Sequence, residues 1–345
     1  MLGARPRSRR PAAAPAASGP PASGAWLYSP RADFWVVAGG GGVLLVVLAL
    51  VLQWRGDREL SAADVLLGEL HLGATYGAIV RRRLWRWMPL DVLAIPLAIL
   101  AATYLLMGNG ASLLVTTAVL CLGAWHRGRQ NLGIALHYHR RAGGPASPLH
   151  HWLLRAAFYL PMAAAVAYYA STAPTHEGDE FHNLSLGPAL LWGLGSAAAI
   201  GVLAYLIWTV GRTASPDERA TAAVHPCERW LVLANAVGFA SAYVLGAWTS
   251  SFVLVLALHH EVQYLCFTYA AARRAEALGQ APAAEARRLV RFALWPAIGL
   301  TSWAFCWWAD LAALDPFLTA GLLGHYWLDG RIWTARARRL GAVGD

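Results

Sequence analysis

Charged side chains are scarce in this sequence. Lysine, arginine, aspartate and glutamate make up only 14% of the 345 residues, whereas 57% are hydrophobic. Soluble globular domains carry about a quarter charged residues, so the chain fits that class poorly. We therefore expect an all-α protein built as a polytopic transmembrane helical bundle.

Cysteines are equally sparse. The four that occur lie singly in or beside apolar runs, and no two have CxxC spacing: Cys121, Cys227, Cys266 and Cys306. Neither a disulfide framework nor a thiolate zinc site is indicated. We expect them to be small core residues.

Acidic residues are outnumbered by basic ones, 19 against 28, which gives a net charge of +9. A basic surplus can indicate nucleic-acid binding. Here, however, the arginines cluster at the ends of apolar runs, where they set topology and face anionic lipid. The expected partner is thus the lipid bilayer, and no nucleic acid.

The apolar runs predict about ten membrane spans. Residues 1–30 are rich in proline, alanine, serine and arginine, and we expect a disordered cytoplasmic tail there. Residues 31–340 would form a single transmembrane helical domain. The predicted spans are 34–54, 62–80, 90–107, 111–130, 152–171, 188–210, 230–248, 250–269, 293–311 and 316–334.

Arginine-rich loops predict the orientation of these spans. With the N-terminus inside, every loop with several arginines falls on one side, and the acidic loop at 175–183 falls on the other. The positive-inside tendency then places both termini in the cytoplasm. The expected location is a bacterial-type inner (plasma) membrane.

Histidines recur at one depth in this topology. They lie in the second, fourth, eighth and tenth spans, all of which would run inward: His71, His126, His259, His260 and His325. Ionisable groups inside a bilayer normally face the bundle interior and pair with one another. The pattern predicts one buried site toward the cytoplasmic half.

Several of these histidines have a polar side chain one helical turn later. The pairs are His126 with Gln130, His259 with Gln263, and His325 with Asp329. This spacing lets a helix offer a ligand together with a neighbour that orients it. His137 follows His126 by eleven positions, which returns to within about 20° of the same helix face.

Clustered imidazoles indicate a metal site. Neutral imidazole suits iron, copper and zinc, whereas magnesium and calcium need more oxygen ligands. The candidate metal ligands are His71, His126, His137, His259, His260 and His325. The candidate catalytic residues are Glu261, Tyr264 and Asp329, and the candidate cofactor-binding residues are Gln130 and Gln263. His137, His139, His150 and His151 are open to a second interpretation, as residues of the membrane interface.

Four short motifs resemble the integral-membrane, histidine-rich non-haem iron oxygenases, which include fatty-acid desaturases and hydroxylases and the bacterial carotene-cleaving dioxygenases. They are WHRGRQ at 125–130, HYH at 137–139, HHEVQY at 259–264 and HYWLDG at 325–330. The HxxxH and HxxHH spacing of desaturases is absent, and one histidine per helix is more similar to the carotene-cleaving group. The resemblance implies non-haem iron, one or two ions, in preference to copper or haem.

The leading hypothesis is a metal-dependent membrane oxygenase, hydroxylase or desaturase that acts on a lipid-like apolar substrate with O2. A separate electron donor protein is a possible partner. Two alternatives stay open. Paired transmembrane histidines also hold b-type haem in electron-transfer proteins. Intramembrane histidine and carboxylate groups also form the relays of proton-coupled transporters.

Overall fold

A computed structural model describes residues 26–51, 67–68, 70–76, 79, 84–86, 88–143, 147–172, 185–214, 224–247, 251–277 and 315–332. Over these residues the chain is helical and contains no strand, so the all-α prediction is confirmed there. The N-terminal elements are α1 (Pro30–Ala32), η2 (Asp33–Val37), α2 (Gly40–Val51), η3 (Leu84–Arg86), η4 (Leu90–Ala94) and α4 (Ile95–Gly108). The later helices are α5 (Ser112–Arg141), α6 (Pro148–Thr172), α7 (Pro188–Ala214), α8 (Pro226–Gly246), α9 (Ser251–Ala277) and α12 (Asp315–Ile332).

Four helical stretches are long and apolar enough to cross a membrane: Leu90–Gly108, Pro148–Thr172, Pro188–Gly211 and Pro226–Gly246. A fifth is added if the bent pair Pro30–Val37 and Gly40–Val51 is one span. Two of these stretches, which contain α4 and α7, direct large apolar side chains outward, including Leu97, Leu105, Trp192 and Ile207. Such faces suit lipid contact, so these helices suggest a membrane protein.

The predicted count of about ten spans is larger than the four or five helical stretches that could cross a membrane in the described residues. The span expected at 293–311 lies outside the described residues, and the one at 62–80 is described only in part. The helices α5, α9 and α12 occupy the predicted positions 111–130, 250–269 and 316–334. They carry most of the candidate ligands. The count and the orientation of the termini therefore stay predictions.

The first predicted span, at 34–54, is bent where the glycine run Gly39 to Gly42 begins. The axes of the two halves differ by 54°. Gly39 at the break has a φ of +91°, a conformation that suits glycine. A Cβ at this position would also approach Ala234 Cβ to 2.7 Å. The bend thus lets the chain backbone pack closely against α8.

The end of the predicted tail is attached to the bundle. The buried Asp33 carboxylate accepts from the backbone N–H groups of Leu27 and Tyr28 and from the Tyr138 hydroxyl on α5. Trp26 packs edge-on against the His225 ring at the start of α8. Residues 26–29, which we expect to be disordered, are therefore ordered, because a buried carboxylate satisfies their amides. Residues 1–25 lie outside the described part of the chain.

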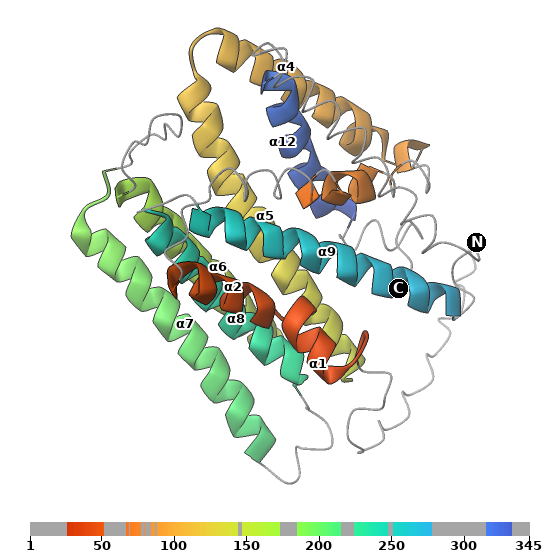
Figure 1. The fold of residues 1–345 in the computed structure, drawn as a ribbon, viewed down its shortest axis with the longest axis vertical. Coiled ribbons are helices and arrows are strands. Elements are labelled where there is room, and N and C mark those ends of the chain that lie inside the picture. The colour runs from red at the N-terminus through yellow and green to blue at the C-terminus, as the bar shows by residue number, and fades with distance from the viewer. Residues whose placement is uncertain are drawn as a thin grey trace, which may run out of the picture.

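The long helix α5 links two groups of helices (Figure 1). At one end it contacts α4 and α12, and along the rest it contacts α6 and α8, with α7 packed on α6. Tyr138, Phe158, Tyr205 and Leu231 form much of the core between α5, α6, α7 and α8. The helix α9 packs against α2 and α8. This arrangement brings side chains from α5, α9 and α12 together.

Candidate metal centre

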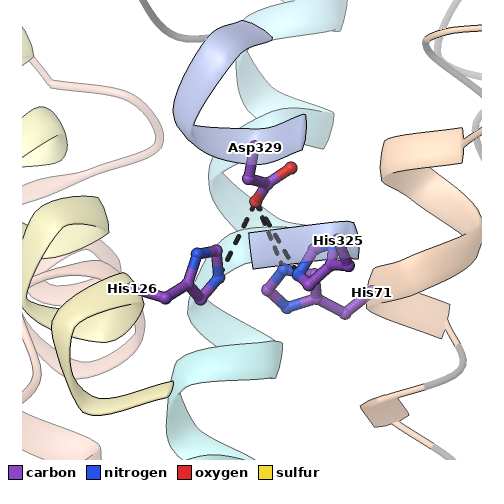
Figure 2. Close-up of side chains that lie close together, drawn as sticks. All are labelled: His71, His126, His325 and Asp329. Carbon is purple, nitrogen blue, oxygen red and sulfur yellow. Dashed lines mark ion pairs between the residues drawn. The ribbon is translucent and has the colours of Figure 1, made fainter. Parts of the chain in front are cut away.

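Three histidines and one aspartate meet at the contact between α5 and α12. His126 comes from α5, His325 and Asp329 come from α12, and His71 comes from the helical residues 70–76. His325 and Asp329 are four positions apart, so both lie on one face of α12. Each of the four residues is at most 4% exposed. Figure 2 shows the three rings directed at the Asp329 carboxylate.

The distances in this His3Asp cluster match those expected around one ion. Asp329 Oδ2 lies 3.6 Å from His71 Nε2, 3.8 Å from His126 Nε2 and 3.9 Å from His325 Nε2. All four ligand atoms lie within 4.8 Å of one another. Ligand atoms about 2.1 Å from a tetrahedral ion are about 3.4 Å apart. The three distances from Asp329 Oδ2 exceed this value by 0.2 to 0.5 Å, so small movements would bring the carboxylate and the imidazoles to one ion, and an ion with more than four ligands would keep open positions.

The second oxygen of Asp329 is held by hydroxyl groups. The Thr75 hydroxyl donates to Oδ1 at 2.6 Å, and the Tyr264 hydroxyl donates to the same atom at 3.3 Å. The two hydroxyl oxygens lie 3.1 Å apart. Hydrogen bonds of this kind fix the orientation of a ligating carboxylate. Oδ2 is thereby left facing the imidazoles.

Two imidazole nitrogens in the cluster are unusual for buried polar atoms. Within the described part of the chain, Nε2 of His71 and Nε2 of His126 have no hydrogen-bond partner. Leaving such an atom without a partner in a buried site costs about 1–3 kcal/mol. A metal ion would satisfy both nitrogens at once, so the residues present fit a metal.

Aromatic rings hold the histidines in place. The His71 ring is stacked on Tyr264 at a centroid distance of 4.0 Å, with an angle of 8° between the planes. The His126 ring lies over Tyr326 at 4.9 Å. Stacking restricts ring rotation, which keeps the Nε2 atoms directed inward.

His260 on α9 borders the cluster. Its ring centroid lies 5.0 Å from that of His71 and 5.1 Å from that of His126. It does not belong to the ligand group defined by His71, His126, His325 and Asp329.

Gln130 and Gln263 do not reach the cluster with a hydrogen bond in the described residues. Gln130 Nε2 donates to the His260 carbonyl at 3.4 Å and to Gln263 Oε1 at 3.3 Å. Gln263 Nε2 donates to the Val37 carbonyl at 2.6 Å, at the break in the first span. The two amides therefore connect α5, α9 and the bent pair, and their assignment to cofactor binding stays a prediction.

Three predicted site residues lie away from the ligand group. His259 packs on α2, where a Cβ at Gly42 would come within 2.6 Å of its ring, and it borders a cavity of about 20 Å³. Glu261 lies beside Gly68, because a Cβ there would be 3.1 Å from Glu261 Oε1. His137 packs edge-on against Phe267. Eleven residues of helix place His137 about 16 Å along α5 from His126, so the two cannot share one ion despite lying on one face.

Two residues of the site were not anticipated from the sequence. Thr75 follows His71 by four positions, the same spacing that singled out Asp329 after His325. The four-residue spacing after a histidine could therefore have identified Thr75. Tyr326 lies beside His325 in sequence, and its contact with His126 depends on how α12 packs against α5. No spacing in one helix predicts such a contact.

Arginines fix the end of α12 that carries Asp329. Arg129 on α5 donates to the Gly330 carbonyl at 3.0 Å. Arg331 donates to both Asp91 oxygens, at 2.8 and 3.2 Å. The first bond satisfies a carbonyl of the last helical turn, and the second ties α12 to η4. The helical turn that carries Asp329 is thus attached to both α5 and η4.

The donor set limits the chemistry of this site. Three imidazoles and one carboxylate suit iron, zinc or copper, and they lack the oxygen atoms that magnesium and calcium require. Comparisons of the chain with protein-family models, with curated proteins and with solved structures found no match. The candidate metal centre thus stands on the geometry of the chain's own residues.

Proposed function

We propose that this protein is a membrane-embedded non-haem iron oxygenase, of hydroxylase or desaturase type, that acts on a lipid-like apolar substrate. The observation that carries the proposal is the buried cluster of His71, His126, His325 and Asp329, all within 4.8 Å. Mixed histidine and carboxylate ligands with open positions are typical of ferrous sites that use O2. Iron bound there would supply the binding and reduction of O2.

Each residue has a role in the proposed site. The three imidazoles and Asp329 Oδ2 bind the metal. Thr75 and Tyr264 orient Asp329 and hold protons at its other oxygen. Tyr264 and Tyr326 also cover the rings and limit access of water. A site with little water favours oxidation of an apolar substrate over side reactions.

The surroundings support an apolar substrate from the bilayer. The cluster lies between helices, and α4, next to α12, directs leucines such as Leu97 and Leu105 outward. Both a lipid chain and O2 are concentrated in a membrane. His126 lies 14 residues after Ser112, or about 21 Å along α5 toward its arginine-rich end. We place the site in the cytoplasmic half of a bacterial-type inner membrane, with both termini cytoplasmic and an electron donor protein on that side.

A b-type haem fits this cluster less well. The centroids of the His71, His126 and His325 rings are 4.6 to 5.8 Å apart in pairs. Two axial histidines must lie on opposite faces of a flat macrocycle. The third ring and the Asp329 carboxylate occupy the space that the macrocycle would need.

Metal analysis of the detergent-purified protein tests the proposal. We expect iron bound at His71, His126, His325 and Asp329, no Soret band, and loss of that iron in His126→Ala and Asp329→Asn. His137→Gln is the matched control, because it changes a histidine of α5 that lies outside the cluster. After anaerobic reduction, nitric oxide should give the electron paramagnetic resonance signal of a high-spin ferrous nitrosyl complex. Absence of stoichiometric iron, or equal iron in the His126 and His137 variants, would refute it.

A further inference from the structure

A second group of ligand-type side chains lies where three helices end. His139 is in the last turn of α5, His150 in the first turn of α6, and Glu228 in the first turn of α8. We propose that His139, His150 and Glu228 form a second metal site, separate from the first, for a divalent transition metal of the zinc or ferrous iron class. The two sites share α5, on which His139 follows His126 by 13 residues. That spacing corresponds to about 20 Å, too far for one ion or one metal pair.

Glu228 is placed between the two rings. Its Oε2 lies 3.0 Å from His139 Nδ1, and its Oε1 lies 2.8 Å from His150 Nε2. The rings are stacked at a centroid distance of 4.2 Å, with 18° between their planes. One ligand atom from each residue lies within 4.8 Å of the others. Ligand atoms around a tetrahedral ion are about 3.4 Å apart, so binding requires the carboxylate to move by about half an ångström.

Burial makes this cluster unusual without an ion. His150 and Glu228 are fully buried, and His139 is 4% exposed. His150 Nε2 is paired with the Glu228 carboxylate at 2.8 Å, whereas His150 Nδ1 has no hydrogen-bond partner in the described residues. A fully buried imidazole with an unpaired nitrogen is unfavourable. Coordination of one nitrogen would remove part of this penalty.

Neighbouring side chains support the ligands as in known metal sites. The Tyr205 hydroxyl on α7 donates to Glu228 Oε1 at 2.8 Å. The Trp208 ring lies 5.0 Å from the His150 ring. Partners of this kind orient the ligating groups and raise metal affinity by about 10-fold to 100-fold.

The ligand types indicate the class of metal. Two imidazoles and one carboxylate form the protein ligand set of many zinc sites and of non-haem ferrous sites. Because the ligands come from α5, α6 and α8, a bound ion would tie three helix ends together, and Tyr205 would connect α7 to them through Glu228. Its removal should therefore lower the stability of the bundle.

Metal content and thermal unfolding test the second site. The detergent-purified wild type should bind one divalent ion at this site in addition to any ion at the His3Asp cluster. His150→Gln and Glu228→Gln should each lose one equivalent and melt at a lower temperature. His151→Gln is the matched control, since its side chain is adjacent but outside the group. Elemental analysis identifies zinc or iron.

The double variant His126→Ala with His325→Ala separates the two proposals. It removes two ligands of the His3Asp cluster and leaves the second group intact. We expect it to bind one equivalent of Co2+, with the visible bands of a nitrogen and oxygen site, and Tyr205→Phe should weaken that binding by about 10-fold or more. If the double variant binds no Co2+, or if His150→Gln and His151→Gln bind equally, the second site is refuted. Loss of the first metal alone leaves this conclusion unaffected.

Discussion

The Thr75 hydroxyl lies 2.6 Å from Asp329 Oδ1, although 254 positions separate the two residues in the chain. This contact joins the helical residues 70–76 to α12, and those two segments together supply His71, His325 and Asp329. The threonine therefore acts on the proposed metal through the carboxylate that it orients.

Thr75→Val should weaken metal binding without removing a ligand. Valine keeps the shape of the side chain but leaves Asp329 Oδ1 with one donor fewer. We expect metal affinity to fall by about 10-fold to 100-fold, measured by competition with a chelator. Thr103→Val is a suitable control, because that hydroxyl donates to the Ile99 carbonyl within α4. Equal affinities in the two variants would contradict the role of Thr75.

Tyr264→Phe should separate ring packing from hydrogen bonding. The substitution keeps the ring stacked on His71 and removes the hydroxyl near Asp329. We expect bound iron to persist, with a changed ferrous nitrosyl spectrum and a lower turnover. Tyr205→Phe, which affects only the second group, should leave that spectrum unchanged. An unchanged spectrum in Tyr264→Phe would mean that Tyr264 serves packing alone.

Gly42→Ala should destabilise the protein while leaving the first metal in place. The added Cβ would lie 2.6 Å from the His259 ring, and such overpacking costs about 1–3 kcal/mol. Gly193→Ala on α7 meets no atom within 4 Å and should be neutral or stabilising by up to about 1 kcal/mol. Thermal unfolding and iron content measure both effects. Loss of iron in Gly42→Ala would instead indicate that His259 is a ligand.

Asp91 and Arg331 should be energetically coupled, so that the effects of removing each of them on stability are not additive. Asp91 is mostly buried, and Arg331 holds it with two hydrogen bonds. Removing either partner leaves the other without its counter-charge and should lower the free energy of unfolding by about 1–3 kcal/mol. The partial exposure of Arg331 places the effect toward the lower end of this range. The double variant Asp91→Asn with Arg331→Gln should lose less than the sum of the single variants. Strict additivity in a double-mutant cycle would show that the pair contributes little.

Hydrophobic patterning predicted helix positions well, because long apolar runs have few alternatives in a membrane. The span expected at 188–210 corresponds to α7 at Pro188–Ala214. The flexible glycine run at Gly39 to Gly42 is visible in the sequence, but the size of the bend is not, because a glycine run is compatible with both a straight helix and a break. The choice depends on packing against Ala234, which is far away in sequence.

In the candidate site, too, features local to one helix could be predicted from the sequence, whereas contacts between helices could not. Spacing of four residues pointed to His325 and Asp329, because that pattern is local to one helix. His137 was included on angular position, which ignores the rise along the helix. Glu228 was not singled out at all, because its contact with His139 and His150 exists only after α8 packs against α5 and α6.

The bond from Gln263 to the Val37 carbonyl spans 226 positions of chain, and it bears on how the protein is made. The ribosome releases the first bent segment long before α9 has been synthesised. A bare carbonyl within hydrocarbon is costly, so the early segment must keep this group hydrated or hold a straighter shape until Gln263 arrives. We therefore expect the kink to reach its final shape only after α9 has been synthesised and Gln263 can donate to Val37.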